Sequence, residues 1–454
     1  AQEYEQADEI LNLASQQELY HPQLQQLQLQ SYLRHGQLSS ASDILQDILS
    51  NDPNNQAVCL SLALLKMRQD KLDEAEELLT KLKVQDPNLL PVTAAQVQIN
   101  IQRNKPIEAL RLCDEMVSNL NNASAYILRA RTYAALGQTD RTVEDLERAT
   151  TIEPNNIDVW SAISDFYTSV GQQDKAIAGV QRALSLASNN IQIQKRAILL
   201  FLASGDPGKI RQGRTILDEA LGANPEDIEL RLFKARLLLT EGTAPAIESA
   251  QRILRGITED QPANGQAWLL LGDIWLRQGQ PGEAMDAALR GLAHKSDDKM
   301  LLMLKARAEA ARSPLLAIAT LNLLREIDPN DVDVARYLAD TYIAAGAPKQ
   351  AVNLLQKQLT VCDASTRRRC SIALAVALYK NGNKEEAQKE FDSLLASEPN
   401  DPAPLLAQTP LLRDDRLWDQ IVQKVTDWRR DRPKDNRTPV SIAKDLMSGD
   451  GEAK

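Results

Sequence analysis

Residues 268–296 read WLLLGDIWLRQGQPGEAMDAALRGLAHKS. Apolar residues recur every three or four positions in two stretches of this segment, which is the pattern of amphipathic helices. Gly279 stands between the two stretches, where a glycine commonly ends a helix. The segment therefore predicts a hairpin of two helices, a first helix (helix A) and a second helix (helix B).

The same pattern recurs along the chain at intervals of 33 to 37 residues. A small residue occupies one column of the repeat: Ala41, Ala75, Ala109, Thr142, Ala176, Gly213, Ala250, Ala284, Ala317, Ala351 and Ala387. A second column, twelve residues further on, is mostly proline: Pro53, Pro87, Asn121, Pro154, Ser188, Pro225, Pro262, Ser296, Pro329, Asp363 and Pro399. Since proline cannot continue a helix, the second column marks one boundary for each repeat.

One unit carries the motif of a known family most clearly: Trp268, Leu271, Gly272, Trp275, Ala284, Ala288 and Ser296. It resembles the tetratricopeptide repeat, in which small residues at positions 8 and 20 let helices A and B pack closely. A second unit repeats it from Trp160 to Ala183. The resemblance implies an all-α, right-handed superhelical solenoid of antiparallel helix pairs, whose groove is lined mainly by helices A.

The columns predict the organisation of the chain. We expect a partial repeat with only helix B at residues 1–21, eleven repeats over 22–399, a degenerate twelfth repeat at 400–433 and the start of a truncated repeat at 434–454. Solenoid ends need polar caps, and neither end supplies one. We therefore expect the natural protein to carry more repeats on both sides. Repeats six and seven hold three extra residues each, which we expect in the turns around 206–212 and 243–246.

The composition excludes several classes of protein. The 454 residues are 43% hydrophobic and 25% charged, with 62 acidic against 52 basic side chains, so a disordered chain is excluded. The net charge of −10 and the absence of a basic stripe argue against binding to nucleic acid or to anionic lipid. No apolar run approaches the ~20 residues of a membrane helix, so we expect no membrane insertion.

In the family, positions 2, 5, 9 and 12 of helix A usually point into the groove, and here position 9 alternates in charge. The charged residues that we expect to line the groove are Arg131, Asp165, Arg236, Asp273, Arg307 and Asp340. Two interpretations are open, namely a charged track for a ligand and a ladder of Arg–Asp pairs that fixes the geometry between neighbouring repeats. The ladder is favoured.

Apolar residues accompany these charges at other groove positions: Ile127, Leu232, Leu239, Leu269, Leu276 and Met303. Exposed apolar side chains there would favour an extended segment or an amphipathic helix of a partner protein. The alternative is ordinary packing between successive helices A. The Lys and Asn set with which part of the family grips a C-terminal carboxylate is absent.

Signals for catalysis, metals and cofactors are weak. His21, His35 and His294 are isolated, and no metal-binding spacing includes them. The segment at 205–210, GDPGKI, has the wrong spacing for a phosphate loop and is interpreted as a turn. We expect no enzyme activity, no metal and no cofactor.

Cys362 and Cys370 flank the linker into the eleventh repeat, eight residues apart. They could form a disulfide across the corner, or they could be half-buried thiols like Cys59 and Cys113. Arg367, Arg368 and Arg369 lie beside them, and a second basic cluster follows Trp428. Solvated helix ends are favoured for both clusters over contacts with an anionic partner.

Together these features predict a non-enzymatic scaffold that binds segments of other proteins along its groove. Alternatives are a non-catalytic arm of a larger enzyme or of an envelope or polysaccharide export complex, and a spacer that associates with itself. The long, glutamine-rich array looks like bacterial multi-repeat proteins. That likeness slightly favours the periplasm or cell envelope over the cytoplasm.

Overall fold

The computed structural model describes residues 22–34, 37–398, 401–417, 419–421, 423–424 and 426. The partial repeats expected at 1–21 and 434–454 lie outside these residues, and the degenerate repeat at 400–433 lies only partly inside. Every regular element in the described ranges is an α-helix. The chain divides into two compact units, Ala1–Gln261 and Pro262–Lys454.

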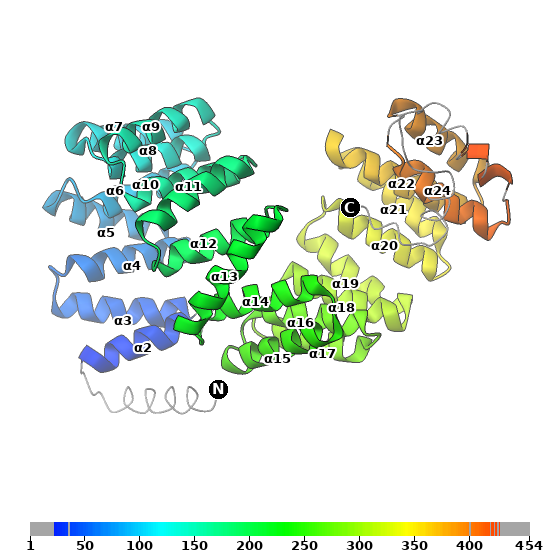
Figure 1. Cartoon of the computed structure of the whole chain (residues 1–454), viewed down its shortest axis with the longest axis horizontal. Coiled ribbons are helices and arrows are strands. Elements are labelled where there is room, and N and C mark those ends of the chain that lie inside the picture. Colours follow the sequence, from blue (N-terminus) through cyan, green and yellow to red (C-terminus); the bar gives the residue numbers. More distant parts are fainter. Residues whose placement is uncertain are drawn as a thin grey trace. The chain divides into compact units, whose positions relative to one another are not determined.

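Within each unit, consecutive helices pack as antiparallel pairs (Figure 1). The helices A are α2 (Pro22–Arg34), α4 (Gln56–Arg68), α6 (Leu90–Gln102), α8 (Ala123–Ala135), α10 (Ile157–Ser169), α12 (Ile191–Leu202) and α14 (Ile228–Glu241) in the first unit, and α16 (Gly265–Arg277), α18 (Lys299–Arg312), α20 (Val332–Ala344), α22 (Ala364–Lys380) and α24 (Ala403–Asp414) in the second. The helices B are α3 (Leu38–Asn51), α5 (Leu72–Gln85), α7 (Pro106–Leu120), α9 (Thr139–Ile152), α11 (Gln173–Leu186), α13 (Pro207–Ala223) and α15 (Ala244–Asp260), followed by α17 (Pro281–Leu292), α19 (Pro314–Ile327), α21 (Pro348–Val361) and α23 (Lys384–Ser397).

The small-residue column lies where helices A and B touch. Ala284 and Ala317 have no exposed surface, and the other alanines of this column are equally buried. The column residue Gly213 of α13 packs so closely on α12 that a methyl group there would lie 3.1 Å from the side chain of Phe201, so the predicted close approach of helices A and B is confirmed at this pair. At position 8, Gly272 of α16 packs closely on α18, the helix A of the next repeat, where a methyl group would overlap the buried side chain of Leu304.

The proline column positions the next helix through its carbonyl oxygen. The indole nitrogen of Trp268 donates to the carbonyl oxygen of Pro262 at 2.8 Å, and Trp160 makes the same bond to Pro154. An Asn or Asp that follows then caps helix A, as Asn264 does by accepting from the backbone N–H of Ala267 at 3.0 Å. The motif tryptophan thus fixes the boundary of each of these two repeats.

We expected the extra residues of repeats six and seven to lie in turns, but this expectation is wrong. They lengthen helix B, because α13 and α15 each have 17 residues whereas most helices B have 14. In α13 the side chain of Asp206 accepts from the backbone N–H groups of Gly208 and Lys209, and Pro207 occupies the first turn. A good N-cap followed by proline therefore starts the helix early.

Candidate functional site

The helix-A face, defined as positions 2, 5, 9 and 12 of the helices A, is treated separately in each unit. In the first unit Arg131 and Asp165 are exposed and Arg236 is half-buried. In the second unit Asp340 is exposed, while Asp273 and Arg307 are half-buried. The charged candidates are therefore accessible to water or partly so.

In the first unit Asp165 lies between two arginines from neighbouring helices. Arg196 of α12 donates to its carboxylate at 2.9 Å. Desolvation raises the pKa of Asp165, while the charges of Arg196 and Arg131 act against this shift. Arg131 on α8 is near enough to act through its charge, but it makes no hydrogen bond or ion pair within the described part of the chain.

A cavity of about 220 Å³ opens beside these charges. It is lined by Arg131, Ala130 and Ala134 of α8, Thr142 and Leu146 of α9, and Ala162, Asp165, Phe166 and Ser169 of α10. Its walls are mostly apolar, and its two charged groups are Arg131 and Asp165. This combination can receive a small apolar side chain together with an anionic group that Arg131 would bind.

The second unit contains one Arg–Asp pair of the ladder that the sequence favours. Arg307 of α18 donates to Asp273 of α16 at 2.6 Å, so this pair joins two consecutive helices A. Asp340 of α20 has no such partner among the described residues. Desolvation raises its pKa, and only the charge of Arg336 acts against this shift.

The apolar candidates fall into two groups. Ile127 and Leu232 are buried in the packing between helices. Their assignment to an open groove is therefore wrong, and they belong to the core. Leu239, Leu269, Leu276 and Met303 are half-buried.

Four apolar residues lie open to solvent on the helix-A face: Leu33, Leu64, Leu199 and Met300, with 42%, 43%, 51% and 61% of their surface exposed. Leu33 is at position 12, Leu64 and Leu199 are at position 9, and Met300 is at position 2. The sequence does not distinguish these four from the buried candidates, because spacing alone does not reveal how deeply a neighbouring helix covers a side chain.

A half-buried arginine, Arg129, forms an ion pair with the buried Asp145 beside the face, and the repeat pattern alone does not reveal it. Arg129 of α8 donates to both carboxylate oxygens of Asp145 on α9, at 2.8 and 2.7 Å, and to Asp114 on α7 at 2.8 Å. Its guanidinium lies over the rings of Tyr126 and Tyr133. The hydrogen bond with Asp145 raises the pKa of Arg129 further above its ordinary value. This network ties α7, α8 and α9 together.

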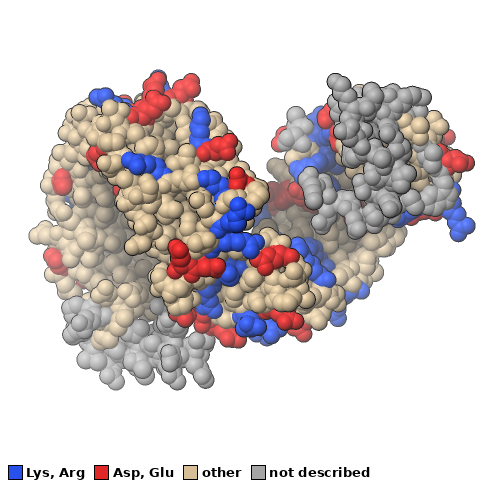
Figure 2. Space-filling view, viewed as in Figure 1, with Lys and Arg blue, Asp and Glu red and all other residues tan. Residues whose placement is uncertain are grey.

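Basic side chains gather over α11–α14 on the face shown in Figure 2, with acidic side chains next to them. Most of these basic residues have acidic partners: Arg196 with Asp165, Lys195 with Asp227 and Glu229, Arg214 with Glu241, Arg231 with Asp260, and Lys234 with Asp218. Paired charges of this kind do not make the concentrated positive surface that nucleic acid binding needs.

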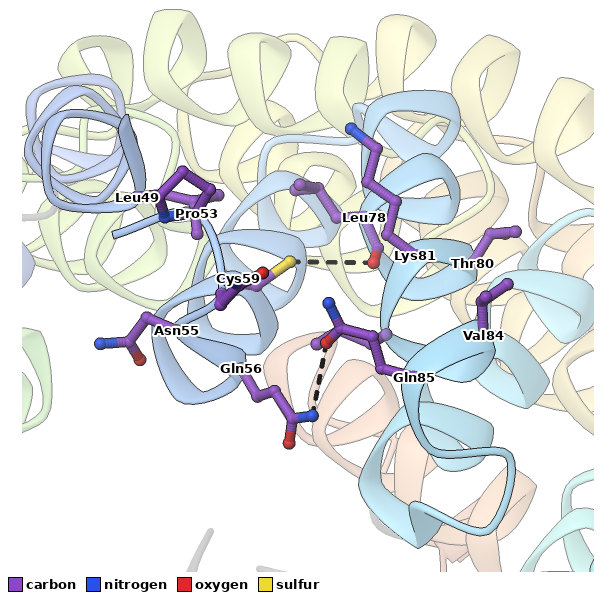
Figure 3. Close-up of a pocket in the computed structure, with 12 residues that line it drawn as sticks. Leu49, Pro53, Asn55, Gln56, Cys59, Leu78, Thr80, Lys81, Val84 and Gln85 are labelled. Carbon is purple, nitrogen blue, oxygen red and sulfur yellow. Dashed lines mark hydrogen bonds between the residues drawn. The ribbon is translucent and has the colours of Figure 1, made fainter. Parts of the chain in front are cut away.

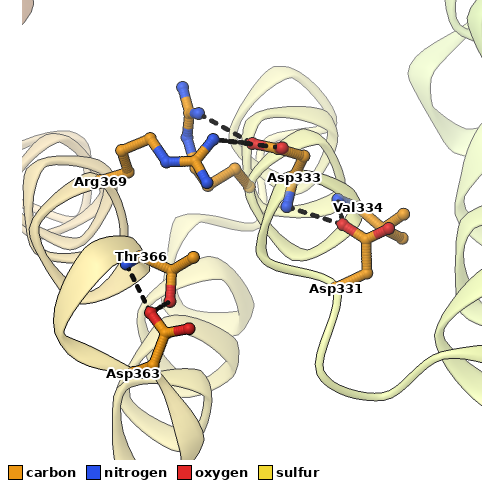
Figure 4. Close-up of polar contacts among 7 residues, drawn as sticks. Asp331, Asp333, Val334, Asp363, Thr366 and Arg369 are labelled. Carbon is orange, nitrogen blue, oxygen red and sulfur yellow. Dashed lines mark hydrogen bonds and ion pairs between the residues drawn. The ribbon is translucent and has the colours of Figure 1, made fainter. Parts of the chain in front are cut away.

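The arginines at 367–369 serve contacts inside the unit. Arg369 donates to Asp333 of α20 at 2.9 Å, as Figure 4 shows, and Arg368 donates to Asp401 at 2.6 Å. In the same view Asp331 and Asp363 accept from backbone N–H groups and so cap α20 and α22. The second basic cluster, after Trp428, lies outside the described residues.

The four cysteines are free and buried. The disulfide that we considered between Cys362 and Cys370 is therefore not formed in this structure. Burial raises the pKa of Cys370 to about 12, and the neighbouring Cys362 adds to the shift. The two cysteines do not flank a linker either, because α22 starts at Ala364 and Cys370 lies within it.

Two further cavities lie away from the helix-A face. One of about 520 Å³ is lined by Leu49, Cys59, Leu78, Lys81, Val84 and neighbouring residues (Figure 3). In it the thiol of Cys59 faces the carbonyl oxygen of Leu78 at 3.8 Å. A second cavity of about 630 Å³ lies between α11 and α13. Neither contains a constellation of catalytic side chains.

Within the described residues no group of His, Cys, Asp and Glu is placed to hold a metal ion. No described helix is both long and apolar enough to cross a membrane. His294 is exposed near the end of α17, whereas His21 and His35 lie outside the described residues.

Comparison with known families decides the identity of the fold. Models described as tetratricopeptide repeat match residues 32–99, 244–308, 123–156 and 373–401. These four stretches are tetratricopeptide repeats. The tetratricopeptide-repeat motif was identified correctly from the unit at 268–296, which lies inside one of these matches.

Solved structures of similar proteins include yeast Tom70, with 14% identity, a TM-score of 0.49 and coverage of 85% of this chain and 93% of that one. The Cut9–Hcn1 hetero-tetramer of APC/C is also similar, with 14% identity, a TM-score of 0.41 and coverage of 96% of this chain and 98% of that one. No curated protein sequence matches the chain.

Proposed function

We propose that this chain is a non-enzymatic scaffold that binds a segment of a partner protein on the helix-A face of its first unit. The observation that carries the proposal is Arg131, an exposed guanidinium without an ion-pair partner in the described residues, at the rim of the 220 Å³ cavity. The other charges around it, Asp165 and Arg196, satisfy each other at 2.9 Å.

The partner segment is expected to combine an acidic side chain with apolar ones. An Asp or Glu would pair with Arg131, and a small apolar side chain would enter the cavity between α8 and α10. Leu199 on α12 offers an exposed apolar contact on the same type of face. Association of this kind buries apolar surface and satisfies a free cation without breaking the ion pairs that hold the repeats.

Capture from a native extract tests the proposal when groove variants are compared with matched controls. The groove variants are Arg131→Glu and Leu199→Asp, and the controls are Arg148→Glu on α9 and Ile107→Asp on α7, which are also exposed. We expect a partner that the unchanged chain and both controls retain and that the two groove variants lose by about tenfold or more. Circular dichroism verifies that each variant is folded. Equal capture by groove and control variants would contradict the proposed site.

A further inference from the structure

The helix α19 in the second unit carries an apolar outer face opposite its core face. Leu315, Leu316, Leu323 and Ile327 expose 67%, 52%, 44% and 38% of their surface. Leu316, Leu323 and Ile327 follow one another by seven and four residues, and the exposed Ala319 completes the same side. The opposite side, with Ala317, Leu321 and Leu324, is already buried in the core.

The other repeats of the chain show that this face is exceptional. At the position of Leu316, the remaining helices B have Ser40, Glu74, Glu108, Arg141, Lys175, Gln212, Ser249, Glu283, Gln350 and Glu386. At the position of Leu323, they have Asp47, Lys81, Glu115, Arg148, Arg182, Glu219, Gly256, Arg290, Lys357 and Ser393. Leucine at both positions therefore departs from a pattern of polar residues and glycine, and about half of each side chain remains exposed.

The charges on the neighbouring helices B point to what covers this face. α17, which precedes α19 in the stack, exposes Glu283 and Asp286, and α21, which follows it, exposes Lys349 and Lys357. Neither lysine forms an ion pair within the part of the chain that the structure describes. Asp286 is partly neutralised by Arg290 at 2.8 Å. The apolar strip is thus flanked on one side by α17, with two acidic groups and one basic group, Arg290, and on the other by the two lysines of α21.

Such a surface is complementary to itself. A two-fold axis parallel to α19 lays the helix on its own copy and brings α17 of each chain over α21 of the other. Glu283 then faces Lys349 on both flanks, while Arg290, which pairs with Asp286 in its own chain, lies level with Lys357. We infer that the outer face of α19 is a contact between two copies of this chain. The interface is separate from the partner-binding face proposed above, and it leaves that face free in both copies.

The size of the patch sets the expected strength. One helix face with two flanks lies at the lower end of protein interfaces, below about 1,200 Å². The association is therefore expected in the micromolar range of concentration.

Sedimentation velocity of the whole chain from about 1 to 200 μM tests the inference. We expect a shift from monomer to dimer across this range. The variant Leu316→Glu/Leu323→Arg gives α19 the charges that α17 has at the same positions, Glu283 and Arg290, and should remain monomeric throughout. Ile107→Glu, which changes an equally exposed apolar residue in the first unit, should dimerise like the unchanged chain. Circular dichroism and thermal melting check that both variants are folded.

Charge reversal separates a contact between copies from unspecific apolar association. Lys349→Glu should weaken the dimer by about tenfold, and adding Glu283→Lys in the same chain should restore it. A monomer at every concentration would overturn the inference, as would a dimer that ignores the leucine variant or a charge reversal that the second reversal does not repair. A monomer that instead binds a different protein through Leu316 and Leu323 would equally overturn it.

Discussion

Arg307 on α18 donates to Asp273 on α16 at 2.6 Å, and this ion pair joins the first helices of two consecutive repeats. Both residues occupy position 9, where the charge alternates along the sequence. At this pair the alternation serves the geometry between repeats. Arg131 occupies the same position in the first unit without such a bond, which is why it, rather than the whole column, is assigned to a partner.

The pair of the half-buried Arg129 and the buried Asp145 is expected to stabilise the first unit more than exposed pairs do. Arg129→Ala would leave Asp145, whose side chain is only 7% exposed, without its counter-ion, at a cost of about 3 kcal/mol in the free energy of unfolding. Asp145→Ala should cost less, about 1–2 kcal/mol, because Arg129 keeps its bond to Asp114 at 2.8 Å. Urea unfolding followed by circular dichroism measures both, and equal losses would contradict this ranking.

The contact of Gly272 with α18 predicts that alanine is not tolerated there. A methyl group would overlap the side chain of Leu304, which is fully buried and would have to shift within the core, so Gly272→Ala should cost about 1–3 kcal/mol. Gly222 in α13 is the matched control, because nothing lies within 4 Å of an added methyl group. There, alanine should stabilise the helix by up to about 1 kcal/mol. Thermal unfolding that moves in the same direction for both variants would argue against the close packing at position 8.

Asp340 is expected to reduce stability at neutral pH. Desolvation raises its pKa in the folded chain above the ordinary 3.8, so the folded state holds the proton more tightly than the unfolded state. The stability that comes from holding this proton is fully present below the ordinary pKa of 3.8, and it is lost as the pH rises through the raised pKa of the folded chain. Asp340→Asn should therefore raise the melting temperature at pH 7 and leave it almost unchanged near about pH 3. A variant that melts lower than the original at pH 7 would show that Asp340 has a stabilising partner instead.

The number of reactive thiols decides whether Cys362 and Cys370 form a disulfide or remain free thiols. The structure has four free, buried cysteines, and burial raises the pKa of Cys59, Cys113 and Cys370. We expect slow reaction with a thiol reagent in the folded chain at pH 7, and four reactive thiols after unfolding without reductant. Two thiols under the latter condition would show that the disulfide forms in the natural setting.

The fold could be predicted from the sequence because every repeat needs the same types of residue at the same helix contacts. A small residue such as Ala284 or Gly272 is needed wherever two helices touch, and a residue such as Pro262 is suited to the boundary, so the columns align without any structure. The lengthened helices could not be predicted in this way. Extra residues near Asp206 change the spacing equally whether they form a loop or another helical turn, and the capping bonds of Asp206 decide the matter.

The candidate site was less accessible to sequence analysis. Spacing places Ile127 and Leu199 on the same type of face, but neighbouring helices bury Ile127 and leave Leu199 open to solvent. Likewise Asp165 pairs with Arg196 instead of with a position-9 arginine, because the bond depends on how α12 is placed next to α10. Depth and pairing across repeats come from three-dimensional packing, which a single periodic pattern does not encode.

The most direct test of the central claim is site-specific photo-crosslinking in the native extract. A photoreactive amino acid replaces Leu199 on the helix-A face in one sample and Ile107 on helix α7 in another, since both side chains are exposed. The account predicts a discrete crosslinked partner from position 199, lost when Arg131→Glu is added, and none from position 107. The same crosslinks from both positions, or a crosslink at 199 that persists with Arg131→Glu, would contradict the assignment of this face as the binding site.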